Sequence, residues 1–409
     1  MGTGIRGAFV AAPPARPAGA APVRLLVVGE EHVRAKVARH YLLLREREGV
    51  EAQLYVDDRS GITREVTAQH PLPVHYAPNP RAALAYLRGF ARVFARVRPQ
   101  VLEVYTSVHP ALLIAMMAYA RARGVPSVVV CRGELYPPLF HGMRRHDRAL
   151  LVAVLRMARL VVYKELYMEA MLERHAPRVP RFLWTNAVPV RADEPPARTG
   201  NHVLFLNWFH PERNLDVVVR AADRVRRAVP DVQFHLVGGV GERAGASGFY
   251  AALHRHEQAL AALIAELGLE RTVHIHPFTP RVDPHYARAR VFLFPADHVF
   301  CNYALLEAME RGVPPVVSDQ RDPDARRIVE DGVNGVVVPI DPDAVADAVV
   351  WLLGDEARRA RMGQAARRTV IERFDLGRSA HALAEQYRRL AGAAGRPAAP
   401  AAAHTPAEG

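Results

Sequence analysis

The chain has 409 residues and a formal net charge of +12 at pH 7. Its hydrophobic content of 50% and mean hydropathy of −0.05 are typical of a globular protein, and its length suits two domains. No apolar run reaches the roughly 18–20 residues that a membrane-spanning helix needs. The excess of arginine is explained either by a GC-rich genome or by an anionic partner; the sequence has no recognised nucleic-acid-binding module.

The two ends of the chain are rich in Ala and Pro, and we expect residues 1–22 and 392–409 to be disordered tails. The first of these lacks the hydrophobic segment of a signal peptide, so we expect a cytoplasmic protein. In that compartment Cys131 and Cys301 are expected to be free thiols. No Cys or His spacing resembles a zinc site, and no metal is expected.

Strand and helix patterns alternate along the first half of the chain. The predicted strands are 24–29, 53–56, 101–105, 127–131, 160–163 and 182–184, and the predicted helices are 33–48, 81–98 and 110–123. A polar, Pro-rich linker at 191–201 follows. This alternation is typical of a parallel sheet with helices on both faces.

The same alternation restarts after the linker. The predicted strands are 203–206, 232–237, 273–276, 291–294, 316–317 and 335–338, and helices are predicted near 211–229, 248–267, 284–289, 343–353, 356–374 and 377–390. We therefore predict two tandem Rossmann-like α/β domains, 23–190 and 202–375. A last helix, 376–391, is expected to cross back to the first domain. Ligands of such sheets bind at the carboxyl ends of the strands, and we expect an active cleft between the domains.

The stretch 295–319 combines a strand end, a loop and a helix that carries Glu307 in its first turns. The free N–H groups at a helix N-terminus suit a phosphate, and a carboxylate beside them accepts hydrogen bonds from two vicinal hydroxyls, as on a ribose. Together they indicate a site for a nucleoside diphosphate. The alternative interpretation is that Glu307 only complements the helix dipole at the surface.

Four segments of the second half carry a family resemblance. They read "VLFLNWFHPERNLD", "FHLVGG", "LLEAMERGVPPVVSD" and "EDGVNG", and the turn 186–189 reads "NAVP". In this combination the chain, over about residues 23–390, resembles the retaining glycosyltransferases of family 4, which have the GT-B fold. The resemblance is strongest over 203–340. It implies a nucleotide-sugar donor, with a UDP-sugar as the first guess, no required cofactor, and an acceptor that is a glycan, a lipid-linked molecule or a small molecule.

The resemblance also implies site residues. Glu307 matches the second glutamate of the family's Glu-x7-Glu pair, which is expected to hold the ribose. Arg213 matches a basic position that neutralises the diphosphate as charge builds on the leaving group. The backbone of Phe300, Cys301, Asn302 and Tyr303 would bind the sugar and phosphate, and the base would lie against the segment that ends at Phe278.

The chain departs from the family pattern at several positions. The first glutamate of the pair falls at Val299, or at His298 if one loop residue is added, so that carboxylate is absent or is supplied by Asp297. The family's first diphosphate-binding arginine falls at Trp208, which leaves Arg213 to act alone. The glycine pair that usually follows the first strand is missing, and Gly29 alone stands at that strand end, where we count it with the binding residues.

Other polar residues follow strands of the first domain. Arg132 stands where the family has a histidine, and with Glu134 it is either a substrate-contacting pair or a structural ion pair; we include Arg132 with Glu307 and Arg213 as the residues that serve the reaction. His109 is a cleft residue or a structural one. The remaining two, Lys164 and Glu165, hold an acceptor or form a solvated helix start.

The predicted helix 81–98 has arginines on one face, at positions 81, 88, 92 and 96, next to apolar residues. It either rests on an anionic membrane at its inner face, if the acceptor is a lipid, or is an ordinary surface helix of an Arg-rich protein. We conclude that the sequence favours a retaining glycosyltransferase. The alternatives are a non-catalytic GT-B partner or regulator that binds nucleotide and, more remotely, a sugar phosphorylase or epimerase.

Overall fold

The structure is a computed structural model that describes residues 21–29, 35–57, 64, 67–68, 70–131, 133, 135–192, 198–241, 248–297, 301–318 and 328–393. Nearly all of the two predicted tails lies outside these ranges. The described chain divides into two compact units. The C-terminal unit is Thr185–Leu376, and the N-terminal unit combines the residues up to Trp184 with those from Gly377 onward.

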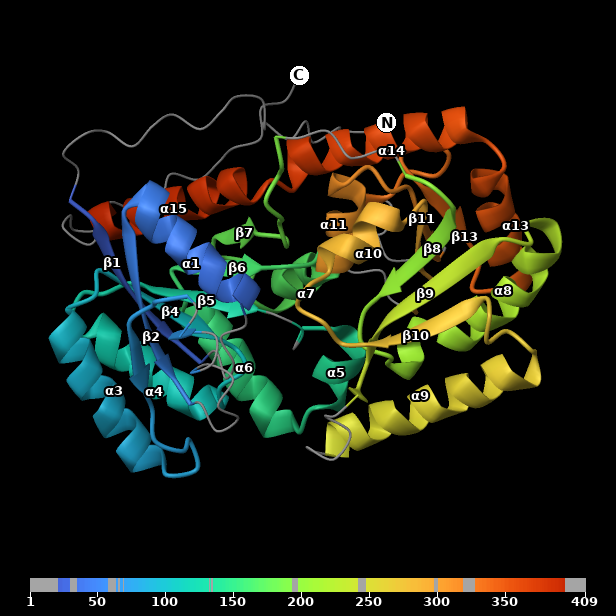
Figure 1. The fold of residues 1–409 in the computed structure, drawn as a ribbon. Helices are drawn as coiled ribbons and strands as arrows, with labels where there is room; N and C mark the ends of the chain where they lie inside the picture. The colour runs from blue at the N-terminus through green and yellow to red at the C-terminus, as the bar shows by residue number, and fades with distance from the viewer. Residues whose placement is uncertain are drawn as a thin grey trace, which may run out of the picture. The chain divides into compact units, whose positions relative to one another are not determined.

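The N-terminal unit is built on a seven-stranded sheet in the order β3-β2-β1-β4-β5-β6-β7, in which all pairings are parallel (Figure 1). Its strands are β1 (Val23–Val28), β2 (Val50–Val56), β3 (Val74–Tyr76), β4 (Val101–Tyr105), β5 (Ser127–Cys131), β6 (Leu160–Tyr163) and β7 (Arg181–Leu183). The central strands are buried on both faces and rich in Val and Leu, as parallel strands between two helix layers must be.

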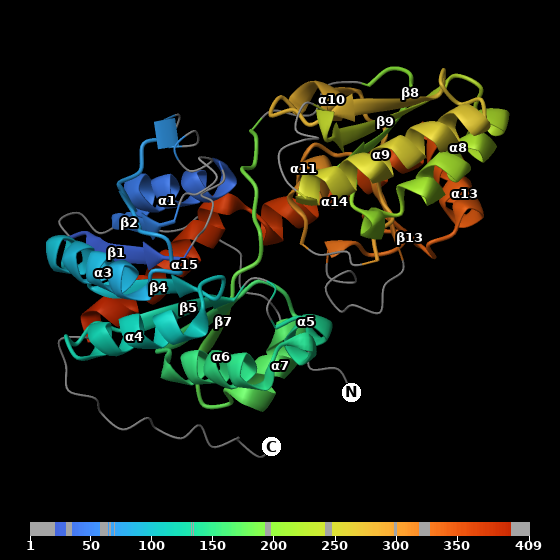
Figure 2. The same cartoon turned by 90° about the horizontal axis from the view of Figure 1, so that it is seen from below.

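Two helix layers cover this sheet, as Figures 1 and 2 show. One layer holds α1 (Ala35–Glu48) and α15 (Leu376–Ala393), which share a core cluster with β1 and β2. The other layer holds α3 (Ala83–Val97), α4 (Pro110–Arg121), α6 (Arg145–Met157) and α7 (Tyr167–His175), and the short α5 (Pro137–Gly142) also contributes to its core. The last helix of the chain is therefore part of the core of the N-terminal unit.

Buried polar contacts fix α15 to this sheet. Glu103 of β4 is 1% exposed and accepts hydrogen bonds from the hydroxyls of Tyr41, at 2.6 Å, and Tyr387 of α15. Burial raises the pKa of Glu103, while these hydroxyl donors act in the opposite direction. At the far end of α1, Glu48 accepts from Arg388 at 2.6 Å. Because Thr185–Leu376 separates α15 from the rest of this unit in sequence, these specific contacts determine its register on the sheet.

The C-terminal unit contains a six-stranded parallel sheet in the order β10-β9-β8-β11-β12-β13. Its strands are β8 (Asn201–Leu206), β9 (Val232–Gly239), β10 (Val273–Pro277), β11 (Val291–Phe294), β12 (Pro315–Ser318) and β13 (Val336–Val338). With the first sheet, this confirms the predicted fold class of two Rossmann-like α/β units.

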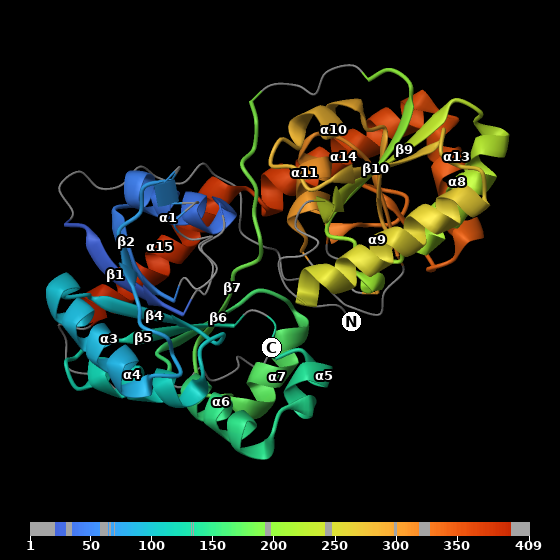
Figure 3. The same cartoon turned by 60° about the horizontal axis from the view of Figure 1, so that its bottom comes forward.

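Helices also cover both faces of the second sheet, best seen in Figure 3. They are the 3-10 turn η1 (Pro211–Arg213), α8 (Leu215–Ala228), α9 (Gly248–Glu266), α10 (Asp283–Arg288), α11 (Tyr303–Glu310), α13 (Pro342–Leu353) and α14 (Glu356–Arg373). Right-handed crossovers place α8 and α9 on one face, and α10 and α11 on the other because the strand order reverses after β10. No described helix is both long and apolar enough to cross a bilayer.

Candidate functional site

The strand order of the second sheet reverses between β8 and β11, so the loops that follow these two strands diverge to opposite faces. Such a switch point at the carboxyl ends of parallel strands is where ligands of open α/β sheets bind. The loop after β8 holds the 3-10 turn with Arg213, and the loop after β11 leads to α11, so two of the predicted binding segments meet at this point.

Asn214 fastens the two loops to each other. It adopts a left-handed conformation with φ of 49°, which ends the 3-10 turn before α8 begins. Its side-chain amide donates to the backbone oxygen of Pro295 at 2.8 Å and to the carboxylate of Asp297 at 2.9 Å. The backbone N–H of Asp297 in turn donates to the oxygen of Glu212 at 2.9 Å. Asp297 is therefore held at the switch point, where a substitute for the missing family carboxylate would be needed.

The guanidinium of Arg213 is partly buried, and the described residues do not accept hydrogen bonds from all of its N–H groups. Its Nε and one terminal nitrogen are buried and have no hydrogen-bond partner among the described residues, and the guanidinium carbon lies 5.3 Å from the ring centre of Phe294. Burial lowers the pKa of Arg213, opposed by the charges of Glu212 and Asp297. Because an unsatisfied buried donor costs free energy, such a group indicates an anionic ligand.

The aromatic side chains Trp208, Phe278 and Tyr250 gather beside the same sheet edge. The rings of Trp208 and Phe278 stack with 5.0 Å between centres and 5° between planes, and Tyr250 meets Trp208 edge-on at 5.7 Å. Gly238 allows this approach, because a Cβ on it would lie 1.8 Å from the Asn207 oxygen. Phe278 is 43% exposed, so the predicted base-contacting residue presents an aromatic surface to solvent.

The N-terminus of α11 is fixed by side-chain contacts. Asn302 caps the helix, accepting from the N–H of Ala304 at 2.8 Å, and the amide of Asn186 donates to the Cys301 oxygen at 2.7 Å. Cys301 is buried and, like Cys131, is a free thiol, as the sequence predicted. Tyr303 is the first residue of the helix. The segment therefore has the fixed backbone that a phosphate-binding helix start requires.

Glu307 lies one full turn inside α11, and the first turn of this helix contains no acidic residue. Its side chain is half-buried, and its Oε2 lies 3.1 Å from the hydroxyl of the fully buried Tyr286. A carboxylate that only complemented the helix dipole would lie in the first turn and in solvent. The structure thus gives Glu307 a specific partner that the sequence did not predict.

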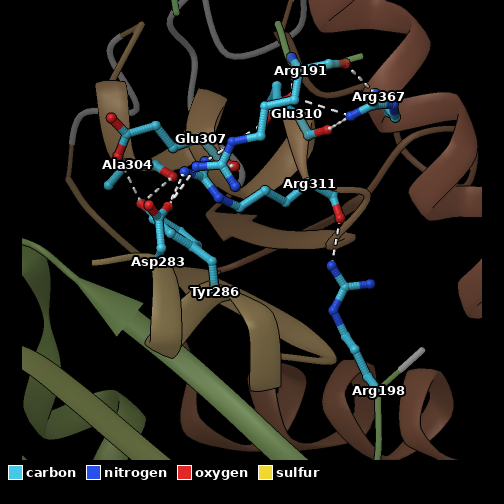
Figure 4. Close-up of polar contacts among 9 residues, drawn as sticks. All are labelled: Arg191, Arg198, Asp283, Tyr286, Ala304, Glu307, Glu310, Arg311 and Arg367. Atoms are coloured by element: carbon cyan, nitrogen blue, oxygen red, sulfur yellow. Dashed lines mark hydrogen bonds and ion pairs between the residues drawn. The ribbon is translucent and has the colours of Figure 1, made fainter. Parts of the chain in front are cut away.

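Figure 4 shows the polar network around this carboxylate. Arg311 donates to the backbone oxygen of Glu307 at 2.8 Å and to Asp283 at 2.6 Å, and its guanidinium carbon lies 4.5 Å from the ring centre of Tyr286. A second arginine, Arg191, also donates to Asp283 at 2.5 Å. Sequence reasoning missed all of these residues, although Arg311 stands four residues after Glu307, a spacing that places both on one helix face.

Glu310, the other carboxylate of α11, has a structural environment. It is 1% exposed and accepts from the backbone N–H of Arg191 at 2.9 Å and from Arg367 of α14 at 3.1 Å. Arg367 also donates to its backbone oxygen at 2.6 Å. The two acids of this helix therefore differ in their surroundings. Glu310 joins α11 to α14, whereas the carboxylate of Glu307 contacts the hydroxyl of Tyr286.

Several of the site residues predicted from the sequence lie outside the described residues, and others lie in the N-terminal unit. Phe300, Val299 and His298 are outside, as are Arg132 and Glu134. In the N-terminal unit Gly29 ends β1 with φ of 95°, and a Cβ on it would lie 2.6 Å from Val108, so packing alone explains this glycine.

The remaining candidates of the N-terminal unit make contacts within that unit. His109 caps α4, its Nδ1 accepting from the N–H of Ala111 at 3.3 Å. Lys164 lies 3.2 Å from the ring centre of Trp184, and Glu165 is only 6% exposed, so the solvated helix start proposed as their alternative is wrong. Among the described residues, no group of three or more His, Cys, Asp or Glu is arranged to hold a metal ion.

Part of the chain, mostly in the C-terminal unit, is similar in sequence to known proteins. Residues 190–369 match the family model "Glycosyl transferases group 1". A GDP-mannose-dependent phosphatidylinositol monomannoside mannosyltransferase of Mycolicibacterium smegmatis is 31% identical over 45% of this chain and 46% of the relative. A D-inositol 3-phosphate glycosyltransferase of Kineococcus radiotolerans is 33% identical over 46% and 44%. The chain spans about half the length of these curated relatives.

Solved structures extend the likeness of fold over nearly the whole chain. Anabaena HepE in complex with UDP matches with a TM-score of 0.71 and 16% identity, over 89% of this chain and 99% of that one. A sucrose-phosphate synthase of Thermosynechococcus elongatus matches with a TM-score of 0.70 and 16% identity, over 91% and 100%.

The state of Arg213 gives a first prediction. Because its buried nitrogens lack partners, we expect Arg213→Met to leave the midpoint of thermal unfolding unchanged or raised. Arg311→Met serves as the matched control, since both terminal nitrogens of that guanidinium are hydrogen-bonded, with only its Nε unpaired among the described residues, and its loss should cost roughly 1–3 kcal/mol. Thermal unfolding of the two ligand-free variants is the measurement. A larger loss for Arg213→Met than for Arg311→Met would show that Arg213 is a structural residue.

These comparisons agree with the geometry at the switch point. Residues 190–369 of this chain are similar in sequence to the group 1 glycosyl transferases, and its two Rossmann-like units have the GT-B fold class.

Proposed function

We propose that the protein is a retaining glycosyltransferase of family 4, which moves a sugar from a nucleoside diphosphate sugar to an acceptor hydroxyl. The observation that carries this proposal is the incompletely paired, buried guanidinium of Arg213 at the switch point of the second sheet. A diphosphate is the ligand that this cation fits, because it supplies charge and several acceptor oxygens at once.

The other residues of the site have roles that follow from their chemistry. Glu307 accepts the ribose hydroxyls, the backbone N–H groups of the segment from Phe300 to Tyr303 bind the sugar and the phosphate, and the base stacks on Phe278. Asp297 takes the place of the family's first glutamate beside the donor sugar. UDP is the first donor nucleotide to test, since the similar Anabaena structure holds UDP, although the similar M. smegmatis enzyme is named for GDP-mannose.

In the reaction the bond between the anomeric carbon and the β-phosphate oxygen breaks, and negative charge builds on the leaving diphosphate. Arg213 and the N-terminus of α11 stabilise that charge without a metal ion. The acceptor oxygen attacks from the face that the phosphate leaves, and the departing phosphate takes the acceptor proton. The configuration at the anomeric carbon is therefore retained. Acceptor binding belongs mainly to the N-terminal unit, where Arg132 is the residue proposed from sequence.

Nucleotide binding tests this proposal. We expect one of UDP, GDP, ADP or TDP to raise the midpoint of thermal unfolding without Mg²⁺, because a ligand that binds only the native state stabilises it. Glu307→Ala and Arg213→Met should each abolish the shift. Absence of any shift at millimolar concentration of all four nucleotides would contradict the proposal and would favour a non-catalytic partner.

The charge distribution of the N-terminal unit supports a membrane-associated acceptor. Between Glu65 and Glu134 the sequence has a single acidic residue, Glu103. This residue belongs to β4 and is only 1% exposed. Arg81, two residues before α3, and the α3 arginines Arg88, Arg92 and Arg96 are all exposed, and Leu84 is 62% exposed beside them. We infer that this cationic face contacts the anionic inner surface of a membrane on which a lipid-linked acceptor is carried.

Vesicle co-sedimentation of the full chain tests this membrane contact. We expect binding to vesicles that contain phosphatidylglycerol, none to phosphatidylcholine alone, and loss at high salt because of screening. Arg88→Gln with Arg92→Gln should weaken binding by roughly thirtyfold, at about 1 kcal/mol per charge. Arg361→Gln with Arg368→Gln, exposed arginines of α14, removes the same charge elsewhere and should change binding little. If both double variants lost vesicle binding equally, the membrane contact would not be specific to the cationic face of α3.

A further inference from the structure

We infer that Tyr286 is a positioning residue for Glu307: its hydroxyl holds the carboxylate in the orientation that accepts the ribose of the donor. This inference rests on the proposed function, in which Glu307 is the ribose-binding group. It concerns a residue of α10, a helix that lies between β10 and β11 and that carries none of the recognised motif segments. Figure 4 shows Tyr286 directed at Glu307 from that neighbouring helix.

The geometry allows the hydroxyl to serve both the helix and the carboxylate. The Tyr286 oxygen lies 3.1 Å from Oε2 of Glu307 and 3.1 Å from the backbone oxygen of Ala304, one turn earlier on α11. Burial raises the pKa of Tyr286, and the charge of Glu307 raises it further. The phenol therefore stays protonated, and its single O–H proton is shared between these two acceptors.

The donor is rigid. Tyr286 is 0% exposed, and its ring packs between Phe292 of β11 and the guanidinium of Arg311. Water has no access to the hydroxyl and does not compete for the bond. Arg311 also donates to the backbone oxygen of Glu307, so the backbone and the side chain of this one residue are fixed by two groups that contact each other.

Asp283 contributes less than its two ion pairs suggest. Its side chain is 63% exposed and that of Arg191 is 46% exposed, so their pair is screened by solvent. The hydrogen bond from Arg191 and then the one from Arg311 lower the pKa of Asp283. Asp283 and Tyr286 are three residues apart and share one face of α10, so the ion pairs align the helix, while the buried hydroxyl is the group that acts on Glu307.

A glutamate side chain has several rotatable bonds, and fixing it on ligand binding costs conformational entropy. A carboxylate that is already held meets two vicinal hydroxyls at once, whereas a loose one must be ordered first. Tyr286 therefore raises affinity for the ribose in particular. A purely structural tyrosine would instead change affinity for every nucleotide alike, and this difference separates the two roles experimentally.

The test compares ribose with deoxyribose nucleotides in isothermal titration of the full chain, using UDP with dUDP and GDP with dGDP. The wild type should bind the ribonucleotide roughly tenfold or more tightly than its 2′-deoxy partner, as expected for loss of a hydrogen bond to a charged group. Glu307→Gln should lose most of that ratio. Tyr286→Phe, which keeps the ring, should reduce the ratio several-fold while binding the deoxynucleotide almost as the wild type does.

Tyr387→Phe is the matched control, because it removes a buried tyrosine–carboxylate bond in the N-terminal unit. It should lower stability and leave the ribose ratio unchanged. An unchanged ratio in Tyr286→Phe, with a lowered ratio in Glu307→Gln, would overturn the role of Tyr286 alone. An unchanged ratio in Glu307→Gln, or no binding of either nucleotide pair, would overturn the ribose role of Glu307 and the inference with it.

Discussion

The arrangement of the second unit depends on one constraint, the pairing of the loops after β8 and β11 at the switch point of the sheet. Asn214 makes this pairing with two hydrogen bonds from one amide, and its left-handed backbone ends the turn that carries Arg213. The guanidinium is thereby held over Phe294 with nitrogens that the described residues do not satisfy. A buried, incompletely paired cation is unfavourable by itself, and this cost is the one expected of the preorganised anion site that we propose.

The two carboxylates of α11 show how one short helix serves stability and binding together. Glu310 is enclosed by Arg367 and the backbone of Arg191, so it joins helices. Glu307 is half-buried and contacts a rigid phenol. The three-residue spacing directs the two side chains along neighbouring rows of the helix surface. Removal of Glu310 would therefore loosen the packing of the C-terminal end of α11 against α14.

Much of the fold could be predicted from sequence, because parallel strands buried on both faces give uninterrupted apolar runs; β4, β5, β6 and β11 begin and end at the predicted residues. Strand β3 was missed because it has three residues, none of them buried, and α5, α6 and α7 were not predicted. In the candidate site, the family resemblance predicted Arg213 and Glu307. The resemblance could not identify Tyr286. This residue lies 21 positions before Glu307 in the sequence, and the two meet only because α10 packs beside α11.

The measurement that tests the central claim most directly is a crystal structure of the full chain with UDP, or with GDP if only that nucleotide binds. The account predicts the diphosphate at the switch point, with phosphate oxygens within hydrogen-bond distance of the buried nitrogens of Arg213 and with the ribose on Glu307. A nucleotide bound elsewhere, or a diphosphate at the switch point that leaves Arg213 without a contact, would contradict it.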